Sequence, residues 1–310
     1  MVRSTVRLAR SPLPPSQSHH CVHRASSAFG APNAAVGLRV PTVAGAVDFV
    51  VGLWWCRVRV MTTSSRLATA IDAVQMGYIK AAQPYREQKD ASLIEIAVFQ
   101  LWAGRLLQVN RASGTSTVVD LGCASGYPVA AYVLDMLKLD YVGIDLCPHQ
   151  IELACREFPE HVECFRRAEM LEYVDSVPNG SLAGVCALFS VFHLPRATHT
   201  RLFDGILSAL CPGGVLLITV SPDASEYYET DFFGAKMYYS QFSAEWYELT
   251  LTQLGFEMIA KQMHTMSSLG EPQATWYMLF SKPGDADTSI FLSDPGESVS
   301  SFDDWNAGII

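Results

Sequence analysis

Apolar residues run through the middle of the chain in two alternating patterns, one of short continuous runs and one with helical spacing. The short runs predict strands at 117–121, 140–144, 162–166, 183–189 and 215–220. The segments between them predict helices at 127–138, 148–157 and 197–210. Continuous apolar strands that alternate with helices indicate a parallel sheet covered on both faces.

The alternation changes after residue 220. A further helix is predicted at 243–254, followed by two strands, 256–263 and 275–282, with only a loop between them. Strands joined by a short connection pair antiparallel, so these two should form a hairpin at the sheet edge. We therefore expect an α/β protein with a Rossmann-like, seven-stranded, mostly parallel sheet, helices on both faces and an antiparallel edge hairpin.

Charge divides the chain into three parts. The 310 residues carry a net charge of −9, which disfavours a nucleic-acid partner. Residues 1–60 hold seven arginines and one acid, whereas residues 283–310 hold six acids and no base. We expect a disordered or targeting extension at 1–60, the main domain at 61–282 and an acidic disordered tail at 283–310.

The first residues leave the location open. An Arg- and Ser-rich start resembles a mitochondrial transit segment, and without that function the protein is expected in the cytoplasm. The apolar stretch 40–55 is short and contains Pro41 and Asp48, so we expect no stable membrane span. The eight cysteines are scattered without a C-x-x-C pair, so we predict buried thiols and no metal site.

The most informative stretch joins the first strand to the next helix and reads V-V-D-L-G-C-A-S-G-Y over 118–127. A turn built from small residues lets the backbone approach a ligand closely, and a helix start attracts an anionic group. The fingerprint for a nicotinamide dinucleotide would need glycines at 124 and 127, where the chain has alanine and tyrosine.

The spacing D-x-G-x-A-x-G instead resembles the first motif of class I S-adenosylmethionine (SAM)-dependent methyltransferases, with alanine replacing the middle glycine. The resemblance implies that SAM is the cofactor and that this turn binds it. The residues concerned are Asp120, Gly122, Ala124, Ser125 and Gly126. The run 210–214 also resembles the L-x-P-G-G turn that precedes the fifth strand of that family.

Later strand ends extend the resemblance. Asp145, followed by Leu146, closes the second strand, where an acid can accept hydrogen bonds from ribose hydroxyls. In methyltransferases similar to this chain, an acid and an apolar residue after the third strand hold the adenine, which points to Glu169 and Met170. The alternatives are a capping role for Asp145 and a solvated helix start at Glu169.

The fourth strand ends near the sulfonium in this family. The resemblance places Phe189 and Ser190 at the methionine end of SAM. His193 lies just beyond and is a candidate general base, with a structural role as the alternative. The motif (D/N)-P-P-(Y/F) of enzymes that methylate exocyclic amines of bases is missing here, so those substrates are disfavoured.

Two aromatic-rich regions flank this core. Helices ahead of the first strand often fold over the cofactor in this class, so residues 61–110 are expected to form a cap. Tyr78 and Tyr85 from this cap, with Tyr238 and Tyr239 from the aromatic stretch after the fifth strand, are candidates for the acceptor pocket and lid. Simple packing is the alternative for all four tyrosines.

The sequence thus predicts methyl transfer from SAM to an unidentified acceptor, with a small molecule favoured. Two alternatives stay open: a non-catalytic methyltransferase-like binding or scaffold protein, and an NAD(P)-dependent oxidoreductase. The acceptor atom, the need for a general base and the oligomeric state cannot be read from the sequence.

Overall fold

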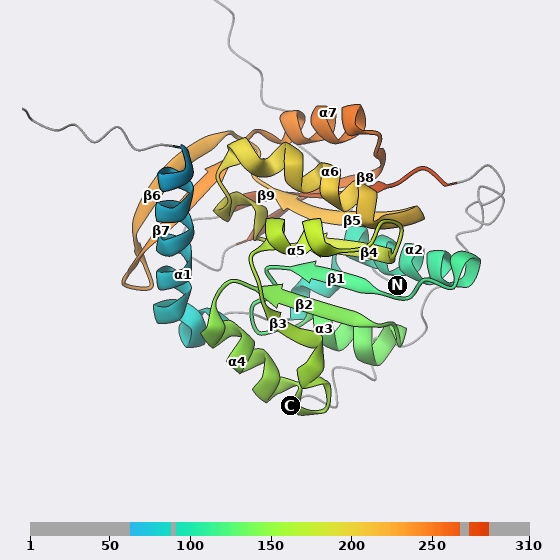
Figure 1. Cartoon of the computed structure of the whole chain (residues 1–310), viewed down its shortest axis with the longest axis horizontal. Coiled ribbons are helices and arrows are strands. Elements are labelled where there is room, and N and C mark those ends of the chain that lie inside the picture. The colour runs from blue at the N-terminus through green and yellow to red at the C-terminus, as the bar shows by residue number, and fades with distance from the viewer. Residues whose placement is uncertain (1–62, 88–90, 267–272, 285–310) are drawn as a thin grey trace, which may run out of the picture. The chain divides into compact units, whose positions relative to one another are not determined.

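The computed structural model describes residues 63–87, 91–266 and 273–284, so the predictions for 1–60 and for the acidic tail beyond residue 284 lie outside it (Figure 1). The strands are β1 (Val118–Leu121), β2 (Tyr141–Asp145), β3 (Phe165–Arg167), β4 (Leu182–Ala187), β5 (Leu210–Val220), β6 (Ser225–Phe232), β7 (Ala235–Gln241), β8 (Glu257–Met266) and β9 (Gln273–Ser281). The α-helices are α1 (Thr63–Glu87), α2 (Ala97–Ser113), α3 (Val129–Ala131), α4 (Pro148–Glu157), α5 (Met170–Ser176), α6 (His199–Ala209) and α7 (Ala244–Leu254). Short helical turns complete the chain at η1 (Ala91–Glu95), η2 (Tyr132–Leu137), η3 (Pro159–Cys164), η4 (Val191–His193) and η5 (Arg196–Thr198).

Seven strands form one sheet in the order β3-β2-β1-β4-β5-β9-β8. The first five pair parallel, and β9 pairs antiparallel with both β5 and β8. The predicted fold class and the edge hairpin are therefore confirmed. Within the hairpin, the strand that opposes the others is the inner one, β9, while the edge strand β8 runs parallel to the first five.

Apolar side chains cover both faces of this sheet. One buried cluster joins β1, β4 and β5 to α2, whose Phe99 and Trp102 are fully buried. The other joins the opposite face of the same strands to α6 and α7, with Phe203 and Tyr247 at its centre. All six residues of β4 are buried, as expected for a central parallel strand.

Three local predictions need correction. The segment expected as a helix at 127–138 is one α-helical turn, α3, followed by the π-helical turn η2. The third strand begins only at residue 165, because the chain first forms the helical turn η3 after Pro159. The run 211–214 lies within β5 rather than before it. Backbone hydrogen bonds of Gly213 and Gly214 with Lys282 continue the ladder there.

A second, two-stranded sheet, the antiparallel hairpin β6–β7, occupies the aromatic stretch after β5. Helix α1 lies beside this hairpin, at the left of Figure 1. The two pack closely at Gly77, where an added Cβ would lie 2.6 Å from Cε of Met237. We call α1 with the β6–β7 hairpin the cap. Its core consists of the buried residues Ala70, Val74, Ala81, Phe232, Met237 and Tyr238.

Of the two helices expected ahead of β1, α1 therefore belongs to the cap, whereas α2 packs on the sheet. None of the helices in the described ranges combines the length and apolar content that crossing a membrane requires.

Candidate functional site

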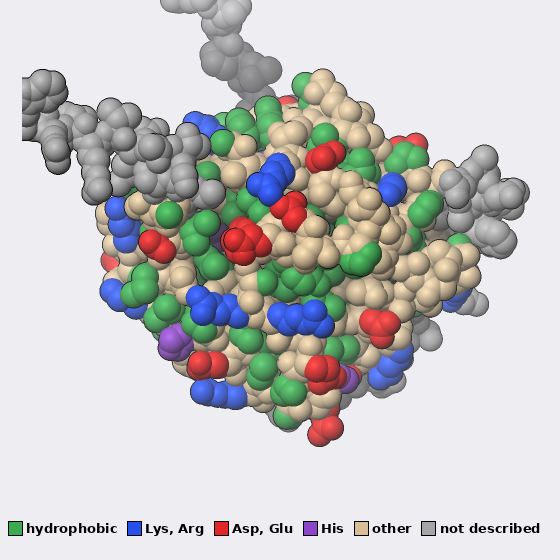
Figure 2. Space-filling model, in the orientation of Figure 1, with side chains coloured by type: hydrophobic (Ala, Val, Ile, Leu, Met, Phe, Trp, Pro, Cys, Tyr) green, Lys and Arg blue, Asp and Glu red, His purple; other side chains and the backbone are tan. Residues whose placement is uncertain are grey.

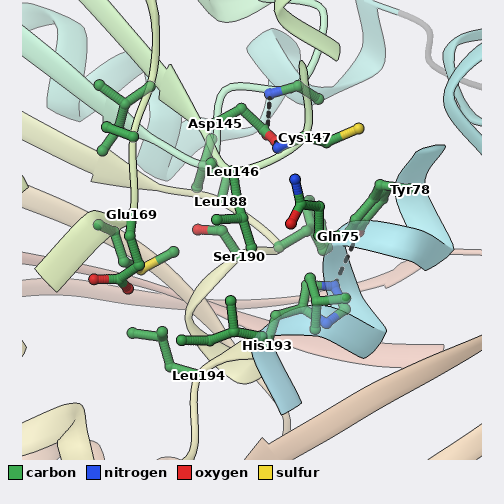
Figure 3. Close-up of a pocket in the computed structure, with 18 of the residues that line it drawn as sticks. Gln75, Tyr78, Asp145, Leu146, Cys147, Glu169, Leu188, Ser190, His193 and Leu194 are labelled. Carbon is green, nitrogen blue, oxygen red and sulfur yellow. Dashed lines mark hydrogen bonds between the residues drawn. The ribbon is translucent and has the colours of Figure 1, made fainter. Parts of the chain in front are cut away.

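A pocket lies where the carboxyl ends of β1, β2 and β4 meet α1 (Figure 3). In an open parallel sheet this edge is the usual place for a ligand. The pocket is lined by Ile71, Val74, Gln75, Tyr78, Tyr85, Gly122, Ala124, Ile144, Asp145, Leu146, Cys147, Ala168, Glu169, Met170, Leu188, Phe189, Ser190, His193 and Leu194.

The turn after β1 is fixed by close contacts. Gly122 has φ +81°, and a Cβ there would lie 2.4 Å from Cβ of Ser190. The N–H groups of Gly122 and Cys123 both donate to the carbonyl of Ile144, at 2.8 and 2.9 Å. Ala124, in the place of the family's middle glycine, also has a positive φ of 51°. A backbone bond thus ties the glycine turn to β2.

Asp145 is held by the same turn. Its Oδ2 accepts from the N–H of Ala124 at 3.0 Å, and its Oδ1 accepts from the N–H of Cys147 at 2.8 Å. A carboxylate oxygen has two lone pairs, so it can accept more than one hydrogen bond. Asp145 and Leu146 line the pocket as the sequence predicts.

Glu169 lies at the start of helix α5 and at the edge of the pocket. It is the N-cap of α5, with Oε2 accepting from the N–H of Glu172 at 3.0 Å. Its other oxygen, Oε1, is buried and has no hydrogen-bond partner among the described residues. A buried oxygen left in this way is costly, so a ligand donor such as an amino group fits there. Met170 lines the pocket beside it.

The end of β4 forms the wall opposite α1. Phe189 has φ 56°, and its N–H donates to Oγ1 of Thr219 at 2.6 Å. The hydroxyl of Ser190 donates to the carbonyl of Leu121 at 2.6 Å. These bonds join β4 to its neighbours β5 and β1, so Phe189 and Ser190 line the pocket at fixed positions.

His193 connects this wall to the cap. Its Nδ1 lies 2.8 Å from the carbonyl oxygen of Tyr238, and its Nε2 lies 2.9 Å from the hydroxyl of Tyr78. Since a carbonyl only accepts, Nδ1 carries the proton and Nε2 accepts from Tyr78. Burial lowers the pKa of His193 to about 4 and raises that of Tyr78 well above its ordinary value, so both are neutral near pH 7.

A second cavity, of about 880 Å³, adjoins the first. Both cavities are bordered by Tyr78, Tyr85, Gly122, Leu188, Phe189 and His193. The larger one extends between the hairpin β6–β7 and the hairpin β8–β9, and Asp120 and Tyr239 line it. Asp120 is buried and accepts from the hydroxyl of Tyr141 at 2.9 Å.

Three of the candidate residues line neither cavity. Ser125 is buried in the turn. Gly126 faces the rings of Phe158 and Phe165, which lie 2.8–3.1 Å from where its Cβ would be. Tyr238 presents its carbonyl to His193 and its hydroxyl to Glu226. These three support the site rather than border it.

Sequence reasoning predicted Tyr78 and Tyr85 of α1 at the site but missed three other residues of this helix that line the smaller pocket. Ile71, Val74 and Gln75 line it, and the amide of Gln75 lies between α1 and Ser190 in Figure 3. Their spacing of three and four residues shows that one face of α1 carries them, but the pattern does not say against what that face packs.

The comparisons with known proteins agree with this geometry. Residues 118–214 match the family model described as a methyltransferase domain, which covers β1 to the start of β5. No curated protein matches the chain. Solved structures with a similar fold include a SAM-dependent methyltransferase from Methanosarcina mazei, with 14% identity, TM-score 0.47 and coverage of 55% of this chain and 93% of that one. Another is a SAM-dependent methyltransferase from Mesorhizobium loti, with 16% identity, TM-score 0.43 and coverage of 60% and 98%.

The strand order and the pocket at the strand ends define an α/β domain that binds a ligand at the switch point of its sheet. The family match and that strand order together identify a class I SAM-dependent methyltransferase domain within this chain.

Proposed function

We propose that this chain is an active SAM-dependent methyltransferase and that its acceptor is a small molecule. The observation that supports this best is the common wall of the two cavities. Phe189 and His193 border both, so a ligand in the smaller pocket lies next to a ligand in the larger one. Placing two reactants side by side accounts for much of the rate in a transfer reaction.

The described residues fit SAM as the cofactor. The positive φ of Gly122 and the close approach of Ser190 fix the glycine turn beside the pocket, Asp145 suits the ribose hydroxyls, and the unpartnered Oε1 of Glu169 suits the adenine amino group. Asp120, a buried acid in the larger cavity, suits the positively charged methionine end. When bound, SAM supplies a methyl group on a sulfonium, which is already a good leaving group.

The chain's own residues then have modest tasks. The cap covers the acceptor and limits its contact with water, Phe189 lies between acceptor and cofactor, and the bond from Ser190 to Leu121 fixes the end of β4. His193 can take a proton only through Tyr78 or after that hydroxyl moves, because Tyr78 already occupies its free lone pair. An acceptor that needs no strong base fits this arrangement best.

The volume of the larger cavity, about 880 Å³, supports a small molecule, because it lies within the range of small-molecule sites. The sheet order weakens the oxidoreductase alternative, since dinucleotide-binding sheets run 3-2-1-4-5-6 without an antiparallel strand inserted next to the fifth. The location, cytoplasmic or mitochondrial, stays a prediction.

Calorimetry with S-adenosylhomocysteine (SAH) and with NADH tests the cofactor. We expect SAH to bind with micromolar affinity and NADH not to bind. Incubation with methyl-deuterated SAM and a small-molecule cell extract then tests transfer, read by mass spectrometry. Binding of SAH without label in any small molecule or protein would favour the scaffold alternative, and binding of NADH alone would favour the oxidoreductase.

A further inference from the structure

The larger cavity has an unusual lining. Nine of its side chains are aromatic: Tyr78, Tyr85, Tyr127, Phe189, Phe192, Tyr227, Phe232, Tyr239 and Tyr277. Its charged residues are both acids, Asp120 and Asp223, and none of the described lining residues is lysine or arginine. The electron-rich faces of the aromatic rings and the carboxylate of Asp223 favour a positively charged acceptor, while the carboxylate of Asp120 is the one proposed for the methionine end of SAM.

Basic residues are present on the surface of the molecule. Figure 2 shows lysines and arginines interspersed with acids on the face it presents. The bases nearest the lining have other partners: Arg86 pairs with Glu157 and lies over the Tyr127 ring, Arg196 pairs with Glu226. The positive charges of the fold are thus held outside the cavity.

Tyr239 is the centre of the aromatic wall. Its ring stacks on Tyr227 with centroids 5.1 Å apart and an angle of 20°, and it lies 5.6 Å from Phe192 and 5.0 Å from the imidazole of His193. Burial and the carboxylate of Glu229 raise the pKa of Tyr239 far above its ordinary value. The wall is therefore neutral at physiological pH and presents ring faces and hydroxyls rather than a phenolate.

A buried hydrogen-bond acceptor without a partner, on the side chain of Gln241, is an independent observation. Gln241 follows Tyr239 by two residues on β7 and lines the cavity. Its amide nitrogen donates to the hydroxyl of Ser225, but its Oε1 is buried and has no partner among the described residues. A buried carbonyl of this kind needs a donor, which a ligand's N–H group supplies.

We propose that the methyl acceptor is an amine nitrogen, which becomes positively charged inside this cavity on methylation. The inference rests on the proposed function. The nitrogen lone pair forms the new N–C bond to the methyl group of SAM while the S–C bond breaks and its electron pair stays on sulfur. One positive charge thus moves from sulfur to nitrogen, toward the aromatic wall.

This reaction matches the state of His193. The amine attacks as its free base, after its ammonium form has released a proton to water. A tertiary amine then has no further proton to lose, and a primary or secondary amine releases one more proton to water after the transfer. A hydroxyl acceptor would need a base, whereas the lone pair of His193 is engaged by Tyr78 and burial keeps its pKa at about 4. An amine acceptor makes no demand on that histidine.

The test uses the full chain and a pair of matched probes. Choline carries a trimethylammonium group, and 3,3-dimethylbutan-1-ol has the same shape without the charge, so choline with SAH imitates the product complex. In calorimetry with saturating SAH, we expect choline to bind about tenfold more tightly than its neutral counterpart. Equal affinities, or a preference for the neutral probe, would overturn the proposal.

Two neighbouring rungs of the cap hairpin supply the variants. Tyr239 pairs with Tyr227 and faces the cavity, whereas Tyr228 pairs with Tyr238, borders neither cavity and lies beneath the ammonium of Lys236. Tyr239→Leu should reduce the preference for choline about fivefold, and Tyr239→Phe, which keeps the ring, should retain it. An equal loss in Tyr228→Leu would mean that hairpin damage, not the ring, causes the effect, and would count against the proposal.

Failure of this inference can be told apart from failure of the proposed function. The choline titration is repeated without SAH, so it reports on the cavity even if the chain binds no cofactor. In the deuterium-transfer assay, label in products retained by a cation exchanger supports an amine acceptor. Label only in neutral or acidic products overturns the amine inference and leaves the methyltransferase intact.

Discussion

The two halves of the site are built in different ways. The cofactor half lies on the ends of β1, β2 and β4, which belong to a sheet with a large buried cluster on each face. The acceptor half lies under the cap, whose own core holds six buried residues among those described. Regions with few buried contacts open most easily. In the proposed function, the sheet would thus provide fixed positions for the cofactor, and the cap would provide the wall that opens for the acceptor.

The largest expected effect concerns the fixed half. Gly122→Ala would place a Cβ 2.4 Å from that of Ser190 and force an alanine into a positive φ. Strain and overpacking together should lower the free energy of unfolding by about 4 kcal/mol and abolish SAH binding. Urea unfolding and calorimetry measure the two effects.

Gly114→Ala is the matched control for that change. Gly114 also has a positive φ, of 72°, but no atom lies within 4 Å of its would-be Cβ. Gly114→Ala should lower the free energy of unfolding by only about 1 kcal/mol, from backbone strain, and leave SAH affinity unchanged. Similar losses in both variants would show that the close approach to Ser190 is not what the turn requires.

Low pH should lower the stability of the protein through two buried histidines, one at the cap and one in the sheet core. His193 joins β4 to the cap, and His199 bonds to Leu194 and Tyr247 in the sheet core. Burial lowers the pKa of each to about 4, so the unfolded chain, near 6.5, takes up protons first. Stability should be full above pH 6.5, fall between pH 6.5 and 4, and be lower at pH 5 by about 2 kcal/mol for each histidine.

Urea unfolding from pH 7.5 to 4.5 measures this loss, and His193→Gln tests its assignment. The variant should lose about half of the pH-dependence that the wild type shows between pH 7 and 5, since one of the two groups is removed. A variant with the full dependence would place the proton uptake elsewhere.

Met237→Ala should show most clearly whether the cap and the sheet open independently. Met237 is fully buried in the cap core, so its truncation to alanine should lower the free energy of unfolding by about 3 kcal/mol. Because the cavity is local to the cap, hydrogen exchange should speed up in α1 and β7 while the amides of β1 and β4 keep their protection. Leu217→Ala, in the sheet core, is the control and should weaken protection throughout. A uniform loss in Met237→Ala would mean that cap and sheet unfold as one unit.

The sheet could be predicted from the sequence, whereas the cap could not. The strands, their order of appearance and the pocket-lining acids Asp145 and Glu169 follow from local patterns, because a buried strand and the turn after it are specified by consecutive residues. The cap does not follow. The bond between Tyr78 and His193 joins residues 115 positions apart, and no local pattern encodes such a partner. The hairpin β6–β7 was missed because its outer strand is mostly exposed and its aromatic residues suited either a loop or a lid.

Ser125 and Gly126 teach a related lesson. The motif spacing predicts that they bind the cofactor, but neither lines a cavity: Ser125 is buried, and Gly126 packs against Phe158 and Phe165. A spacing motif shows which residue types a turn can hold. It does not show whether those residues contact a ligand or only support the shape of the turn.

Asp145→Ala tests the fixed half without disturbing the cap. We expect SAH affinity to fall by about 2 kcal/mol through lost hydrogen bonds to the ribose and through a loosened turn at Ala124. Choline affinity without SAH should not change, because Asp145 borders only the smaller pocket. Calorimetry measures both, and an unchanged SAH affinity would remove Asp145 from the site.

Tyr78→Phe is the smallest change and acts on the junction of the two halves. It removes the hydroxyl that donates to His193 and leaves the ring in place against His193 and Phe232. The loss of one hydrogen bond should favour cap opening by about 1 kcal/mol, seen as faster exchange in α1. Donation from Tyr78 also favours the neutral imidazole, so the pKa of His193 should rise from about 4 toward its ordinary value, as an NMR titration would show. Tyr228→Phe is the control, because Tyr228 also lies in the cap but pairs with Tyr238 and borders neither cavity. A His193 pKa that stays near 4 in Tyr78→Phe would mean that burial alone keeps this histidine neutral and that the hydroxyl does not link the cap to the strand end.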